Sequence, residues 1–194
     1  MSTRREKSKR WTALIALLFA TGVAFAEPAR PYAPYRFLIG EWEVSAEGGG
    51  PTLGVARFRF GPNESYLWYS SSFLDKGAER PHLEGILVWN GVRKNLDMLM
   101  TMDLEHGLVQ EQGVVSVEVD GTVTREITAV YSEGTQPIAR PPAGREGASL
   151  RFKQTYKADG PGRILTRALR ESAQGWVATF PGSDRLVMTR RSRG

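Results

Sequence analysis

The chain holds two histidines, and histidine is the side chain that most readily serves as an acid–base group or metal ligand near neutral pH. His82 lies in ERPHLEG and His106 lies in DLEHGLV, both beside turn residues. Asp103 and Glu105 precede His106, and these three side chains could bind a metal ion. In a strand, however, Asp103 and Glu105 project from one face and His106 from the other. The sequence therefore favours rim histidines, and we assign neither a metal ligand nor a catalytic residue.

The carboxylates provide no clearer catalytic pair. Glu41 and Glu43 alternate with Trp42, so a strand would carry both acids on one solvated face. Asp97 interrupts an alternating apolar run and is expected to point outward. The chain also lacks the GxSxG, GxxxxGK[ST] and HExxH motifs of serine hydrolases, phosphate loops and zinc proteases. These observations favour a protein that is not an enzyme.

Cysteine is absent from the chain. Disulfides, thiol nucleophiles and thiolate metal sites are thereby excluded. A stable fold must then depend on its apolar core.

The first 26 residues have the pattern of a cleavable secretory signal peptide. Residues 1–10 are basic, residues 11–26 are uncharged, and the apolar run ends in Ala24-Phe25-Ala26. The run is shorter than the ~20 residues of a membrane-spanning helix. We therefore expect a periplasmic or secreted protein with no membrane span after cleavage.

Removal of this leader changes the charge balance. The whole chain has 26 basic and 21 acidic residues, but the leader holds five of the bases and one acid. The mature chain is thus nearly neutral, which does not favour nucleic acid as a partner. The sequence does not predict an oligomeric state.

Beyond a proline-rich approach segment, residues 27–34, we place one domain at residues 35–191. Short runs rich in Val, Thr, Tyr, Phe and Trp alternate there with turn signals. The pairs Asn90-Gly91 and Asp120-Gly121 are typical of tight β-hairpins.

Polar and apolar residues alternate within these runs, as expected for strands with one dry face. In ASLRFKQTYKA, for example, Leu150, Phe152 and Tyr156 share one face. About ten such strands with short connections predict an all-β fold, a single antiparallel up-and-down barrel. Residues 132–147 exceed an ordinary hairpin loop, and the sequence leaves open whether they form a lid or a disordered excursion.

The stretch YRFLIGEWEVS would close one end of the barrel. A short helical turn would plug that end, Gly40 would end the turn, and Trp42 would enter the first strand. Gly40-Glu41-Trp42 matches the GxW motif of lipocalins and the wider calycin barrels. The longer stretch, with HLEGILVWNGVRKNLDMLMTMD, resembles nitrobindin-like barrels and a secreted bacterial lipocalin-like family. The resemblance implies an arginine packed over the tryptophan, best matched by Arg190 and next by Arg167.

Apolar residues expected inside the barrel are the candidate ligand-binding residues. They are Trp68 (or Tyr69), Leu87, Trp89, Met98, Met100, Phe152, Trp176 and Phe180. An eight-stranded or larger barrel can enclose one small ligand. We therefore expect a non-catalytic protein that binds or carries a small hydrophobic molecule without a cofactor.

Two alternatives stay open. The resemblance to nitrobindin-like proteins implies a haem-binding barrel acting on nitrogen oxides or peroxide, with His82 or His106 as the iron ligand. The apolar side chains could instead fill the core completely, which would leave a structural or interaction module.

Overall fold

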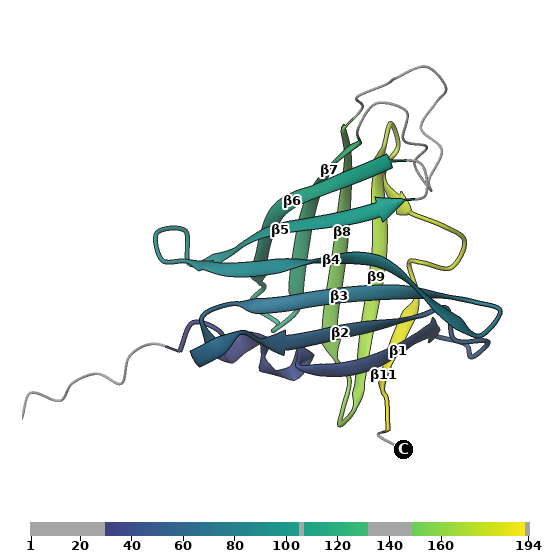
Figure 1. Ribbon diagram of the computed structural model, residues 1–194, viewed down its shortest axis with the longest axis horizontal. Coiled ribbons are helices and arrows are strands. Elements are labelled where there is room, and N and C mark those ends of the chain that lie inside the picture. The colour runs from purple at the N-terminus through teal and green to yellow at the C-terminus, as the bar shows by residue number, and fades with distance from the viewer. Residues whose placement is uncertain (1–29, 105–106, 132–148, 193–194) are drawn as a thin grey trace, which may run out of the picture. The chain divides into compact units, whose positions relative to one another are not determined.

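A computed structural model describes residues 30–104, 107–131 and 149–192 of the chain. Eleven strands and two short 3-10 helices make up the elements of this part (Figure 1). In chain order they are η1 (Ala33–Leu38), β1 (Gly40–Ala46), β2 (Gly54–Phe60), η2 (Pro62–Glu64), β3 (Leu67–Asp75), β4 (Ala78–Asn90), β5 (Asn95–Leu104), β6 (Gly107–Val117), β7 (Val123–Tyr131), β8 (Ser149–Ala158), β9 (Arg163–Ser172), β10 (Gly175–Ala178) and β11 (Leu186–Arg190). No helix among these elements has the length and apolar character that crossing a membrane requires.

The strands pair with their neighbours in antiparallel fashion and close into a barrel. The order runs from β9 through β11 and β1 to β8, and pairing of β8 with β9 completes a ring of ten strands. β10 is additional and pairs with the part of β9 that β11 leaves free. The predicted all-β antiparallel barrel of about ten strands, with a short helical turn, is confirmed.

Alternation of side chains explains why these segments form a barrel wall. In β8, Phe152, Gln154 and Tyr156 face the interior, whereas Arg151 and Lys153 face outward and pair with acids of neighbouring strands. Closure of the sheet leaves almost no strand edge exposed and gives every apolar face a common interior.

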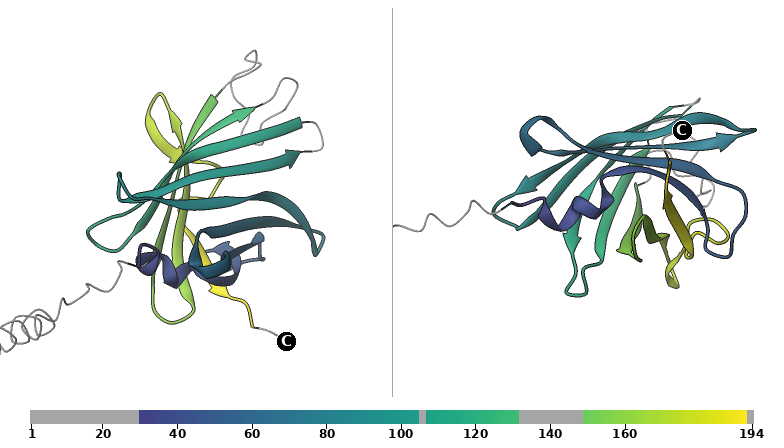
Figure 2. Two further views of the ribbon diagram at one scale, coloured as in Figure 1. Left: turned by 60° about the vertical axis from the view of Figure 1, so that its left-hand side comes forward. Right: turned by 90° about the horizontal axis from the view of Figure 1, so that it is seen from below.

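The end of the barrel where β1 begins, here called the closed end, is covered by η1 (Figure 2). Tyr35 is buried, and its hydroxyl donates a hydrogen bond to the carbonyl of Val115 at 3.3 Å. The Tyr32 hydroxyl donates to the Ser65 carbonyl at 2.9 Å and accepts the Trp89 N–H at 3.0 Å. These bonds fix the helix to the barrel.

Trp42 seals the closed end from inside. It is 1 % exposed, and its indole N–H donates to the Leu38 carbonyl at 2.7 Å. The Arg190 guanidinium lies 4.5 Å from the centre of the Trp42 ring, from the strand position directly opposite. Gly40 has φ +144°, and a Cβ there would collide with the Arg190 guanidinium. Glycine at position 40 therefore leaves room for the arginine above the indole.

The other end, here called the mouth, is where β1 ends and β2 begins. Between β10 and β11, residues 179–185 form turns rather than a strand, and the Ala168 N–H donates to the Ser183 carbonyl at 2.7 Å. Ser183 is fully buried in that turn, and its hydroxyl donates to the Ala168 carbonyl at 2.7 Å. The turn thereby places Thr179 and Phe180 at the interior of the barrel.

Candidate functional site

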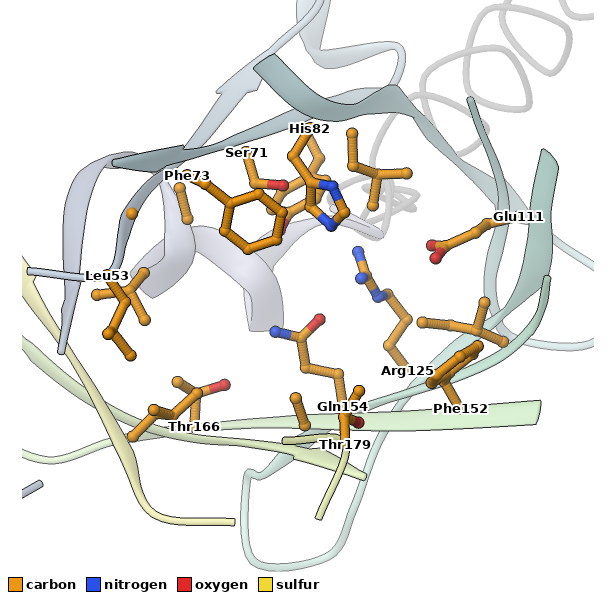
Figure 3. A pocket seen from close by; sticks show the side chains of 18 of the residues that line it. Leu53, Ser71, Phe73, His82, Glu111, Arg125, Phe152, Gln154, Thr166 and Thr179 are labelled. Atoms are coloured by element: carbon orange, nitrogen blue, oxygen red, sulfur yellow. The ribbon is translucent and has the colours of Figure 1, made fainter. Parts of the chain in front are cut away.

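The barrel is filled at its closed end and hollow at its mouth. A cavity of about 220 Å³ lies between the mouth-facing halves of the strands. Its volume exceeds that of a 150 Å³ cavity that holds benzene, so a compact organic molecule has room there. Figure 3 looks into this cavity.

Aromatic side chains and one arginine form the cavity floor. Tyr69 and Tyr156 line the cavity, and the Phe58 ring, which does not line it, packs behind them at 4.7 Å from Tyr69 and 5.7 Å from Tyr156, measured between ring centres. Arg125 spans the floor from β7, and its guanidinium lies 4.9 Å from the centre of the Tyr69 ring on β3. Buried Met98 and Met100 belong to the packed core rather than to the cavity wall. The floor thus separates a solid lower half from a hollow upper half.

Arg125 is the most unusual residue of the interior. It is 5 % exposed, and among the described residues no carboxylate lies within ion-pair distance of it. One Nη1–H group points at the Met100 sulfur at 3.4 Å, and the Nε–H group has no partner in the described residues. Lys and Arg are almost never fully buried unless they are paired. A buried arginine without an acid therefore makes this cavity the candidate functional site.

Glu111 reaches the same cavity from β6 and is 8 % exposed. Its Oε2 atom is buried without a hydrogen-bond partner in the described residues. Burial raises the pKa of this carboxyl above its ordinary value, although the charge of Arg125 acts in the opposite direction. The shift favours the protonated acid, which can donate a hydrogen bond into the cavity.

His82 lines the cavity from β4, and its ring lies 4.1 Å from the ring of Phe73, centre to centre. The Nδ1 atom is buried without a partner in the described residues. Burial and the nearby Arg125 charge lower the pKa of His82 to about 4. The imidazole is therefore neutral at pH 7.

Three hydroxyl groups of the lining, those of Tyr156, Thr166 and Thr179, resemble His82 and Glu111 in one respect. Each has a buried oxygen without a partner in the described residues. Native proteins leave few buried polar atoms unpaired. Six of the seven such atoms found in the described residues belong to side chains that line this one cavity. Their concentration indicates a site that is completed by something other than the described protein atoms.

The mouth carries an apolar rim. Leu53, Phe73 and Phe180 line the cavity, and each is between 36 % and 41 % exposed. Figure 3 shows Phe73 beside His82 on one side, and Gln154 and Thr166 on the opposite side. A ligand passing this rim would meet apolar surface first and the polar groups around Arg125 further in.

The residues expected from sequence to line a ligand site do not all lie together. Phe152 and Phe180 line the cavity. Leu87, Met98 and Met100 are in the packed core below it, and Trp89 packs against that core near η1.

Two of the expected lining residues are on the outer surface. Trp68 stacks under Arg59 at 3.9 Å and donates to Glu84, while its neighbour Tyr69 faces the cavity. Trp176 lies beside the outward-facing Lys153 at 4.9 Å.

The remaining sequence candidates lie away from the cavity. Glu41 forms ion pairs with Arg57 and Arg191, and Asp97 pairs with Arg93. The predictions for His106, Glu105 and residues 132–147, and the leader, lie outside the described residues. Arg167 is exposed on the outer wall, so Arg190 alone of the two arginines stacks on Trp42.

His82 was among the sequence-based candidates, but Arg125 and Glu111 were not, although strand alternation could have found them. In VTREITAVY, Arg125 lies at alternate positions along the strand with Val123, Ile127 and Ala129 on the same face, and all of these are buried. Glu111 likewise shares one strand face with the buried Val109 and Val115 in β6. A charged residue in phase with an apolar strand face is the signal for an interior polar site.

The neutral state of His82 predicts a pH dependence of stability. Between about pH 6.5 and 4, an unfolded chain binds a proton at this histidine and the folded chain does not. The free energy of unfolding should therefore fall through this window as acid is added. Since part of the ring is exposed, we expect the contribution to be about 1–2 kcal/mol.

Urea unfolding of the wild type and of His82→Gln at pH 7 and pH 4.5 measures this contribution. The variant should lose less stability than the wild type between the two pH values. Equal losses in the wild type and His82→Gln would contradict the assignment.

The cavity gives a test of the haem alternative. His82 offers one nitrogen, but a volume of about 220 Å³ is below the roughly 300–1,000 Å³ typical of pockets for drug-sized ligands. The planar macrocycle of haem is larger than such ligands, so these residues do not fit it. A haem titration of the protein should give no Soret shift that depends on His82.

Comparison with models of protein families gives no match to this chain, and comparison with curated proteins gives none either. The fold is a closed antiparallel β-barrel, consistent with a lipocalin-like or calycin-like architecture and compatible with ligand binding.

Proposed function

We propose that this chain is a non-catalytic binding protein that holds a small molecule with an apolar body in the cavity at the barrel mouth. The observation that carries the proposal is the cavity itself, with its apolar rim and its cluster of buried, unpartnered polar atoms. Pockets for small molecules are mostly apolar and contain a few polar groups that fix orientation. The signal-peptide pattern supports a periplasmic or secreted location for this activity.

The chemistry of the cavity argues for binding rather than catalysis. A general base works best when its pKa lies near the working pH. The pKa of His82, at about 4, makes its imidazole a weak base at pH 7, and burial moves the pKa of Tyr156 upward, away from the anion. Among the described residues of the cavity, no hydroxyl is hydrogen-bonded to a histidine as an activated nucleophile would be.

Calorimetric titration with neutral ring compounds tests the proposal. Indole and 1-naphthol should bind to the purified mature protein with a negative heat-capacity change, because apolar surface is buried. Ala168→Phe, which places a ring at the cavity wall, should abolish binding. The matched control Arg167→Phe adds the same ring on the outer face and should bind as the wild type does.

The opposite results have clear meanings. If no ring compound binds, the barrel is a filled structural module. If Ala168→Phe binds as the wild type does, the ligand occupies another surface and the cavity is not the site.

A further inference from the structure

We infer that the cavity takes an organic anion, a carboxylate on a compact body of one or two rings, and that Arg125 binds the carboxylate. This inference rests on the proposed function, because it names the chemical class of the ligand in the same cavity. It is carried by the geometry of one buried cation: among the described residues no carboxylate lies within ion-pair distance of Arg125, and Glu111 interacts with it only from further away.

First, without a ligand, the Arg125 guanidinium has hydrogen-bond donors that no strong acceptor uses. A guanidinium has five N–H donors and no acceptor. In the described structure this group has the Tyr69 ring at 4.9 Å and the Met100 sulfur at 3.4 Å, and its Nε–H group is unpartnered. A sulfur atom is a weak acceptor, and the Tyr69 hydroxyl that also interacts with the guanidinium cannot use all of its five donors. Hydrogen-bonding capacity for a carboxylate is therefore left over, and carboxylates match the guanidinium fork.

The second step is the charge of the cavity. Glu111 shares the cavity but is not within ion-pair distance of Arg125, and its Oε2 atom is unpartnered. Burial raises its pKa, and His82 is neutral at pH 7 because its pKa is about 4. Lys153 forms its ion pair with Glu126 on the outer wall. The interior around Arg125 therefore favours a ligand that brings a negative charge.

The third step is the position of the neighbouring donors. Gln154 lies directly opposite Arg125 in the β7–β8 register, and cross-strand partners on one face are close enough to bind one group together. Figure 3 shows the amide of Gln154 and the guanidinium of Arg125 projecting into the same space. The Tyr156 hydroxyl, whose oxygen has no partner in the described residues, can add a further hydrogen bond to an anion bound there.

The last step is the size and shape of the ligand body. The cavity volume of about 220 Å³ suits one or two rings, and a long acyl chain would not be contained. Phe152, Ile127 and Leu83 provide apolar surface for the body. The hydroxyls of Thr166 and Thr179 are available to a polar substituent on it.

Calorimetric titration with 2-naphthoate and its neutral isostere 2-naphthamide tests the inference. Wild-type protein should bind naphthoate about tenfold or more tighter than naphthamide, because only the former pairs with the buried guanidinium. Arg125→Met should lose this preference and still bind naphthamide. The control Arg57→Met removes an outer-wall arginine and should keep the preference.

Each outcome separates the two proposals. If both compounds bind wild type equally, or if Arg125→Met keeps the preference for naphthoate, the anion site is wrong and the apolar cavity stands. If neither compound binds, and the neutral ring compounds do not bind either, the proposed function fails as well. A measurement without mutation covers the case of a variant that does not fold: the Nε–H resonance of Arg125 should shift with naphthoate and not with naphthamide.

Discussion

Replacing Trp42 by alanine is expected to lower the free energy of unfolding by about 3–5 kcal/mol, the range of large-to-small changes at buried aromatic residues. The indole is 1 % exposed and donates a hydrogen bond to Leu38 at 2.7 Å. Its loss would leave a void between η1 and the barrel and would remove the surface on which Arg190 stacks. Urea unfolding followed by far-ultraviolet circular dichroism measures the change.

Trp68 provides a matched control for this experiment. It is the same residue type in a neighbouring part of the sheet, but it lies on the outer wall beside Arg59 and Glu84. Trp68→Ala should therefore change the free energy of unfolding by about 1 kcal/mol or less. Equal effects of the two substitutions would mean that Trp42 does not plug the barrel.

Arg125→Met is expected to increase the free energy of unfolding of the ligand-free protein by about 1–4 kcal/mol, although it removes the preference for a carboxylate ligand. Burial of a charge costs solvation energy that an anion must offset, and no acid of the described residues pairs with this arginine. Methionine fills much of the same space without charge. A stability gain that accompanies a loss of function is typical of residues kept for binding.

Thermal and urea unfolding of Arg125→Met and Arg125→Lys, both without ligand, test this prediction. Lysine keeps a buried charge and should show no gain. If Arg125→Met is instead destabilised by several kcal/mol, the guanidinium supports the floor of the barrel through Tyr69 and Met100, and its role is structural. If the anion site is right, 2-naphthoate should raise the melting temperature of wild type more than that of Arg125→Met.

The barrel could be predicted from the sequence because its strands and turns depend on residue patterns that span only a few positions. Strand alternation and turn residues recur along the whole chain, and closure follows from the need to bury one face of many antiparallel strands. The types of the turns between strands were harder to predict from the sequence. Asn90, expected in a tight two-residue turn, ends β4 and caps a longer turn by accepting the N–H groups of Val92 and Arg93. The side chain, rather than a following glycine, determines that connection.

The cavity was harder to predict because it depends on depth inside the barrel and on where a strand stops. Met98 and Phe152 both face inward, but the former is packed below the floor and the latter lies above it. Trp176 and Phe180 are four residues apart, so a continuous strand would place both side chains on the same face. β10 ends at Ala178, however, and the chain then bends, so that only Phe180 reaches the cavity. When only apolar residues are considered as candidates for the cavity lining, Arg125 is missed. The proposed ligand class depends on this residue.

The central claim is that the barrel holds a compact organic anion between Arg125 and the apolar rim. A crystal structure of the mature protein with 6-bromo-2-naphthoate tests it most directly, because the anomalous signal of bromine locates the ligand. We expect one bromine peak inside the barrel, with the carboxylate in contact with the Arg125 guanidinium. Bromine found only on the outer wall, or a barrel filled by its own side chains, would contradict it.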